Sequence, residues 1–100
     1  MREVVVLDDA AEDLEKGRSF YDSMEPGVGE YFAQSLLADL ERLSFLHGIH
    51  SKHFGVFRML AGRFPFGIYY RDADTATEVI AILDLRRNPF WIRSEIENRA

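Results

Sequence analysis

Cysteine is absent from the sequence, which excludes disulfide bonds and zinc sites built on thiolates. Apolar runs are short. None approaches the roughly 18 residues that a membrane-spanning helix needs, and no signal-peptide segment follows Met1. A glycine-rich phosphate loop and the nucleophile elbow of hydrolases are also missing. We therefore predict a soluble, cytoplasmic protein with no membrane partner and no cofactor.

Basic residues are the minority, at 12 against 17 acidic residues, and the net charge is −5. The two halves of the chain differ. Residues 1–50 hold 4 basic and 11 acidic residues, whereas residues 51–100 hold 8 basic and 6 acidic residues. Seven of those eight are arginine, which binds carboxylate and phosphate groups in a bidentate manner. An anion-binding site is expected in the second half, but stable nucleic-acid binding by the chain alone is not.

The length of 100 residues, of which 47% are hydrophobic, predicts a single domain over residues 1–100 with a real core. Residues 3–7 (EVVVL) are short, apolar and β-branched, as in a buried strand. Asp8 or Asp9 is the predicted N-cap of a helix whose apolar stripe extends to Met24.

A second helix is predicted from Pro26, as its first residue, to about His47, with Gly48 as its C-cap. The short link between the two helices predicts an antiparallel helical hairpin.

The second half of the chain has strand-like periodicity. Residues 55–61 and 64–70 form two such runs around Gly62 and Arg63, a hairpin signal, and residues 78–85 form the most apolar run, predicted to be interior.

A final helix follows, with Asn88 as its N-cap, Pro89 as its first residue, and Phe90, Trp91 and Ile92 as its apolar anchor. The predicted fold class is α+β, in the order β-αα-β-β-β-α. The N-terminal helical hairpin packs on a small, mainly antiparallel four-stranded sheet, and the other sheet face or an edge is open to a partner.

Tyr69 and Tyr70 are neighbours in one predicted strand, so one faces the core and the other faces the opposite side.

Arginines cluster on or beside the three C-terminal strands. They either form an anion-recognising surface or are ordinary solvent-exposed residues at strand ends. They are Arg58, Arg63, Arg71, Arg86 and Arg87.

His47, His50 and His53 recur at intervals of three residues and raise the question of a metal site. This segment spans a helix end and a loop and contains no carboxylate, so the spacing fixes no ligand geometry. We predict loop histidines and no metal, and the sequence does not define their role.

Three segments together resemble the RelE/ParE superfamily of toxin–antitoxin toxins, and the resemblance is closest to the ParE, or plasmid-stabilisation, branch. They are FGVFRML (54–60), RFPFGIYYR (63–71) and VIAILDLRRNPFW (79–91). The resemblance implies a small toxin that a cognate antitoxin holds inactive. RelE-type members cleave messenger RNA on the ribosome without a metal, whereas ParE-type members poison DNA gyrase.

Within this resemblance, Arg86 matches the arginine at the end of the last strand of the ribonucleases. Other positions of the ribonuclease site differ: Gly67 stands where an arginine is usual, and the terminal segment carries Phe90 and Trp91 in place of a tyrosine. The basic loop shrinks to Lys52 and a histidine. The acidic composition also disfavours a ribosomal RNA target.

The leading hypothesis is a ParE-like, non-enzymatic toxin that inhibits a topoisomerase–DNA complex. An alternative is a RelE-like endoribonuclease, with Arg86 as a catalytic residue. A second alternative is a non-toxic homologue that only forms the antitoxin complex. The residues predicted to bind the antitoxin or the target are Arg58, Arg63, Arg86 and Arg87.

Overall fold

The computed structural model describes residues 2–100 of the chain. The elements follow in the order β1 (Glu3–Val6), α1 (Asp8–Met24), α2 (Val28–Leu46), β2 (Lys52–His53), β3 (Val56–Leu60), β4 (Phe66–Asp72), β5 (Ala76–Asp84) and α3 (Pro89–Arg99).

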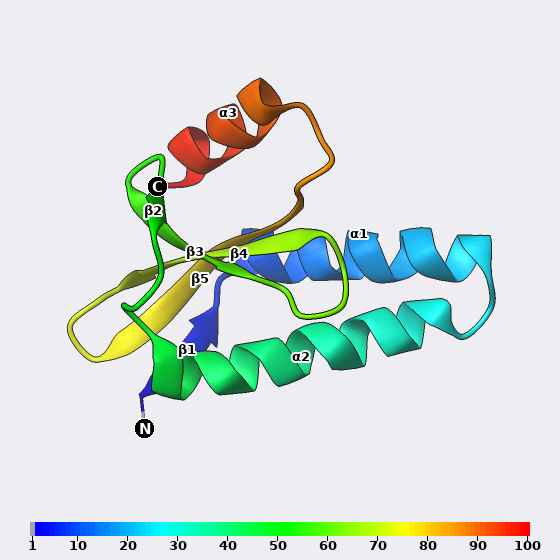
Figure 1. The fold of residues 1–100 in the computed structure, drawn as a ribbon, viewed down its shortest axis with the longest axis horizontal. Coiled ribbons are helices and arrows are strands. Elements are labelled where there is room, and N and C mark those ends of the chain that lie inside the picture. The colour runs from blue at the N-terminus through cyan, green and yellow to red at the C-terminus, as the bar shows by residue number, and fades with distance from the viewer. Residues whose placement is uncertain (1) are drawn as a thin grey trace.

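The strands form one mixed sheet in the order β1-β5-β4-β3-β2 (Figure 1). β1 runs parallel to the first four residues of β5, and the other neighbours are antiparallel. The predicted α+β fold with its N-terminal helical hairpin is confirmed. β5 lies between β1 and β4, as its apolar sequence predicted.

The sheet has one strand more than predicted, because Lys52 and His53 form the short strand β2. A two-residue turn of Phe54 (φ 58°) and Gly55 (φ 87°) connects β2 to β3. Two positive φ angles give a turn whose twist matches that of the paired strands. Phenylalanine rarely adopts a positive φ, so the sequence carries no ordinary signal for this turn.

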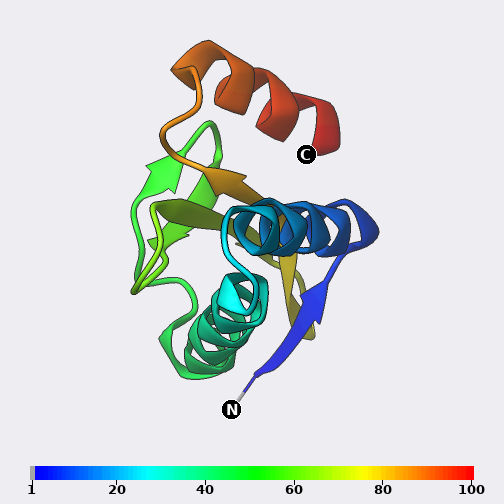
Figure 2. The same cartoon turned by 90° about the vertical axis from the view of Figure 1, so that its right-hand side faces the viewer.

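Helices α1 and α2 lie side by side and pack on one face of the sheet (Figures 1 and 2). Gly17 of α1 makes their close approach possible, because a Cβ atom there would lie 2.6 Å from the ring of Phe32 on α2. Phe32 is fully buried in the core between the hairpin and the sheet.

Both predicted helix starts need correction. α1 begins at Asp8 with Leu7 as its N-cap residue, so Asp8 and Asp9 lie in the first turn, where their charge favours the positive end of the helix. α2 begins two residues after Pro26, and Gly27 is its N-cap with a φ of 94°. Pro26 therefore belongs to the turn.

The opposite face of the sheet is not open, because α3 packs there (Figure 2). Ile92 and Ile96 of α3 are buried against this face. Phe90 lies on the other side of the helix and is 80% exposed, so its predicted role as an anchor is wrong. Tyr69 and Tyr70 do face opposite sides, but both are buried since both faces are covered.

β1 pairs with only part of the edge of β5. An ion pair between Asp13 and Arg99 covers the next part of that edge. Asp13 of α1 accepts a hydrogen bond from the Ile82 amide of β5 at 3.0 Å. Arg99 of α3 donates to both carboxylate oxygens of Asp13 and to the Ile80 carbonyl. The Asp13 carboxylate raises the pKa of Arg99. This pair thus joins α1, α3 and the strand edge.

Candidate functional site

The chain leaves β5 through a tight turn that fixes the direction of two adjacent arginines. The Leu85 amide donates to the Pro65 carbonyl, and the Arg87 amide donates to the Asp84 carbonyl. The Asn88 side chain then accepts from the Phe90 amide at 2.8 Å, and the helix opens with proline at its start, as predicted.

Arg86 is held by groups within the molecule. Its guanidinium donates to both carboxylate oxygens of Asp84, the shorter contact being 2.7 Å, and to the hydroxyl of Tyr21 on α1 at 3.2 Å. Hydrogen bonding to Arg86 lowers the pKa of Asp84, and Asp84 in turn raises the pKa of Arg86. Arg86 is therefore a positioned, exposed cation whose charge is already largely compensated.

Arg87 has different surroundings. Its guanidinium carbon lies 3.8 Å from the centroid of the Trp91 ring, a cation–π contact that orients the side chain without neutralising it. Arg87 and Trp91 line a groove between α1 and the start of α3. Lys16 also lines it, and the apolar part of the lining includes Phe20 and Ile82.

Arg63 lies in the loop between β3 and β4, at the same end of the sheet. It donates to the hydroxyl of Tyr31 on α2 at 3.0 Å. The ring of Phe64 stands between Tyr31 and Tyr21, with centroid separations of 5.6 and 4.9 Å. Since Tyr21 also binds Arg86, an aromatic bridge connects the two arginines. No local sequence pattern could identify Tyr21 and Tyr31 in this role, because the partners lie 65 and 32 residues away.

Arg58 does not join this group. It lies on β3 opposite Tyr69 of β4. Tyr69 is three residues from Phe66, the residue of β4 that pairs with Asp84 at the end of β5. Within residues 2–100 its Nε atom is buried without a hydrogen-bond partner. Burial raises the pKa of the Tyr69 hydroxyl, and the nearby Arg58 charge opposes this shift. The same charge adds to burial in lowering the pKa of His53.

The basic side chains of the molecule differ in whether a carboxylate pairs with them. Within residues 2–100, eight of the twelve basic side chains have a carboxylate oxygen within 4.0 Å. The four without one are Lys52, Arg58, Arg63 and Arg87. Three of the four arginines selected from the sequence thus have uncompensated charge, and the fourth, Arg86, does not.

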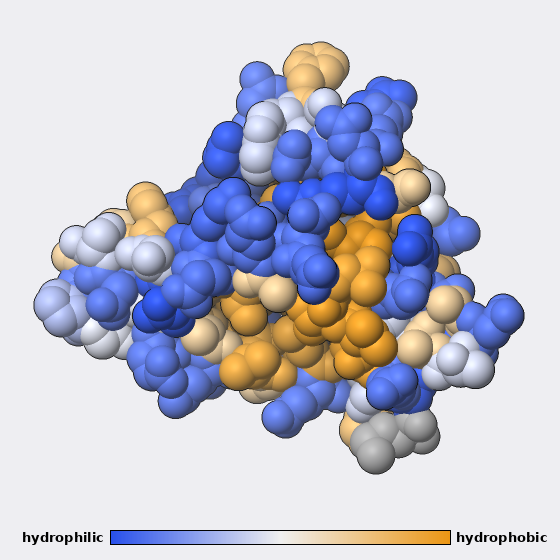
Figure 3. Space-filling model, turned by 180° about the vertical axis from the view of Figure 1, so that it is seen from behind, coloured by the Kyte–Doolittle hydropathy of each residue, from blue (hydrophilic) through white to orange (hydrophobic). Residues whose placement is uncertain are grey.

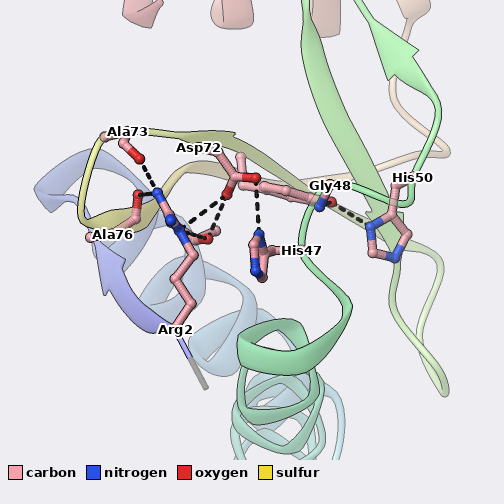
Figure 4. Close-up of polar contacts among 9 residues, drawn as sticks. Arg2, His47, Gly48, His50, Asp72, Ala73 and Ala76 are labelled. Carbon is pink, nitrogen blue, oxygen red and sulfur yellow. Dashed lines mark hydrogen bonds and ion pairs between the residues drawn. The ribbon is translucent and has the colours of Figure 1, made fainter.

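His47 and His50 contact separate partners (Figure 4), and His53 Nε2 lies 3.2 Å from the Ser51 hydroxyl. His47 Nδ1 lies 3.0 Å from Asp72, which Arg2 and Thr77 also contact. Burial opposes ionisation of Asp72, but the bonds from His47 and Thr77 outweigh it and lower the pKa of Asp72. His50 lies against the Tyr70 hydroxyl, which also accepts from the Gly48 amide. In the part of the chain that the structure describes, no three His, Asp or Glu side chains form a group that could hold a metal ion.

No known protein-family profile matches the sequence, and no curated protein matches it. The fold is similar to a chain of the solved structure described as "Chromosomal ParDE TA system from P. aeruginosa", with a TM-score of 0.74 and 20% sequence identity. The similarity covers 82% of this chain and 94% of that chain. The chain therefore has a ParE-like fold. Within residues 2–100, none of the helices combines the length and hydropathy needed to cross a membrane.

Proposed function

We propose that the protein is the ParE-like toxin of a type II toxin–antitoxin system, acting in the cytoplasm on DNA gyrase or a related topoisomerase and neutralised by a cognate antitoxin. The observation that carries this proposal is the similarity of the fold, over 82% of this chain, to a chain of a ParDE system, together with uncompensated arginines at one end of the sheet.

The groove beside Arg87 suits a partner that carries both acidic and apolar side chains. Its lining combines Phe20 and Trp91 with the cations of Lys16 and Arg87. Two carboxylates also line it, but both are paired with arginines, Asp13 with Arg99 and Asp84 with Arg86. Lys16 forms an exposed ion pair with Glu12 at 3.2 Å. Such a pair is weak, so the carboxylate of a partner can compete with Glu12 for Lys16. Arg87 needs no such exchange, because the Trp91 ring is its main contact.

The arrangement favours recognition over catalysis. Arg86 is the residue that a RelE-like ribonuclease would use, and here Asp84 and Tyr21 occupy its Nε and Nη2 donors. Arg58 lies on β3 opposite Tyr69 and shares no hydrogen bond with that arginine within residues 2–100. Phosphodiester cleavage needs an acid and a base at the reacting group as well as cations. The ribonuclease alternative therefore has less support than binding.

The experiment is induced expression of the full chain, with DNA breaks and message cleavage assayed in parallel. The proposal expects growth arrest with gyrase-linked DNA breaks and intact messages. The double variant Arg86→Ala, Arg87→Ala should fold and should arrest growth much less. Codon-linked message cleavage would instead establish the ribonuclease, and antitoxin binding without growth arrest would establish a non-toxic homologue.

A further inference from the structure

Two grooves of the molecule differ in their lining. The groove between β1 and the C-terminal half of α2 belongs to a continuous apolar patch on the back of the molecule, which hydrophilic side chains surround (Figure 3). The groove beside Arg87 lies between α1 and α3, which cover the two faces of the sheet (Figure 2). It measures about 380 Å³ and combines apolar, aromatic and cationic residues with the edge of β5. This mixture of groups is typical of a small-molecule site.

The floor of the groove beside Arg87 is a part of the β5 edge that no strand covers. β1 pairs with β5 only as far as Val79. The Ile82 amide points to this side, because it donates to Asp13. Strand geometry turns the Ile82 carbonyl and the Asp84 amide to the same side, and neither has a hydrogen-bond partner within residues 2–100. The floor thus offers one free acceptor and one free donor next to each other.

This free stretch of backbone is too short to pair with an added strand. On one side, Arg99 already donates to the Ile80 carbonyl and holds Asp13 against the edge. On the other side, the Asp84 carbonyl accepts from the Arg87 amide as the chain turns away from the sheet. An added strand needs a longer row of outward-facing groups. The groove therefore suits a small molecule better than an extended peptide.

Aromatic side chains line the groove from both helices. Phe20 comes from α1 and is 52% exposed, and Trp91 comes from α3. Because the two helices lie on opposite faces of the sheet, these side chains belong to opposite walls above the floor (Figure 2). A planar ring that enters edge-on can therefore contact aromatic walls while its edge reaches the β5 backbone.

The charges of the groove indicate a ligand with one anionic group. Arg87 has no carboxylate within 4.0 Å among residues 2–100, and the exposed pair of Lys16 is weak. A longer polyanion fits less well. The next groove along the molecule, beyond the ion pair at the strand edge, is lined by the carboxylates Asp9, Glu12 and Glu95, which repel further phosphates.

We propose that this groove binds an adenine mononucleotide. The base enters between the two aromatic walls, its 6-amino group donates to the Ile82 carbonyl, and its N1 atom accepts from the Asp84 amide. The phosphate meets Lys16 and Arg87. Guanine fits less well, because its 2-amino group is a further donor for which the floor has no free acceptor. Binding is measured on the isolated chain and does not rest on the toxin function, so either proposal can fail alone.

The test is an NMR titration of the ¹⁵N-labelled full chain with adenosine monophosphate. Saturable shift changes should appear in residues 82–87 and at the indole N–H of Trp91, the single tryptophan of the chain. N6,N6-dimethyladenosine monophosphate keeps the ring and the phosphate but lacks the donor, so it should bind about tenfold more weakly. Inorganic phosphate should leave the Trp91 signal unchanged. Equal affinity for the two nucleotides, or no saturable change at these residues, would overturn the proposal.

A charge variant tests the phosphate end of the groove. Arg87→Met should weaken binding of adenosine monophosphate about tenfold and binding of adenosine much less. Arg93→Met is the matched control, because Arg93 is also on α3 but pairs with Glu97 and does not line the groove. Equal weakening by both variants would contradict the site. Tighter binding of a hexadeoxyadenylate than of the mononucleotide would identify single-stranded nucleic acid as the ligand and would also contradict it.

Discussion

The two ends of β5 differ in how their edge is covered and in the charge around them. Ala76–Val79 pair with β1, which carries the exposed Glu3 and lies beside an apolar groove lined in part by Glu41. Beyond Asp84, the chain presents Arg86 and Arg87 above a groove lined by Lys16 and Trp91. The asymmetry of charge along the sequence thus becomes an asymmetry between two surfaces. A net charge of −5 thus hides two surfaces of opposite local charge.

Between these two surfaces, Asp13 and Arg99 close the strand edge that β1 leaves uncovered. Asp13→Ala should have the largest effect on stability, because it takes the main partner from Arg99, whose side chain is only 14% exposed, and removes the acceptor of the Ile82 amide. We expect the free energy of unfolding to fall by about 3–5 kcal/mol. Urea denaturation followed by circular dichroism measures this change.

The control for this prediction is Glu12→Ala on the same helix, which breaks an exposed pair with Lys16. It should change the free energy of unfolding by less than about 1 kcal/mol. A loss as small as this for Asp13→Ala would mean that the buried pair does not hold the strand edge.

Arg58 sharpens the comparison between arginines that stabilise the fold and arginines that do not. Its buried Nε has no partner within residues 2–100, so Arg58→Met should leave the stability unchanged or raise it by up to about 1 kcal/mol. Arg71→Met is the control, because Arg71 pairs with Glu78 at 2.9 Å, and it should lower stability slightly. A marked loss of stability for Arg58→Met would show that this arginine is structural.

The smallest predicted effect is a pH dependence of stability that arises from His50, in the loop after α2. Burial lowers the pKa of His50, and the folded state therefore binds a proton less readily than the unfolded state. Stability should fall as the pH drops from about 7 to 5, through the ordinary histidine pKa of about 6.5. His50→Gln should flatten this slope in urea denaturation at several pH values. A slope equal to that of the parent would exclude His50 as its source.

The carboxylates Asp72 and Asp84 act in a lower pH window. Their lowered pKa values stabilise the fold above the ordinary aspartate pKa of about 4, and this contribution is lost as the pH falls through the folded-state values. The two windows can be separated, since His50→Gln should leave the loss below about pH 4 unchanged.

Much of the fold could be predicted because local patterns and global packing agree. The apolar run of β5 predicted an interior strand, and Asn88 with Pro89 predicted the start of α3. The turn at Phe54 and Gly55 could not be predicted, because phenylalanine rarely adopts the positive φ that this turn has.

The candidate site was predicted as a set of arginines but not as an arrangement. The sequence indicated four positions, yet only contacts between distant segments show that Tyr21 and Asp84 compensate Arg86 while Trp91 merely orients Arg87. The sequence indicated two possible open surfaces, a sheet face and a sheet edge. The face is covered by α3, whereas the outer edge of β1 has no neighbouring strand within residues 2–100.

The central claim is that uncompensated arginines form the working surface of a toxin. The most direct measurement compares growth arrest by two double variants of equal charge, Arg63→Ala with Arg87→Ala and Arg71→Ala with Arg93→Ala. Arg71 and Arg93 are paired with Glu78 and Glu97, so their loss should leave the growth arrest of the parent intact. The variant lacking Arg63 and Arg87 should lose most of it. Equal growth arrest by both variants, or none by the parent chain, would contradict the account.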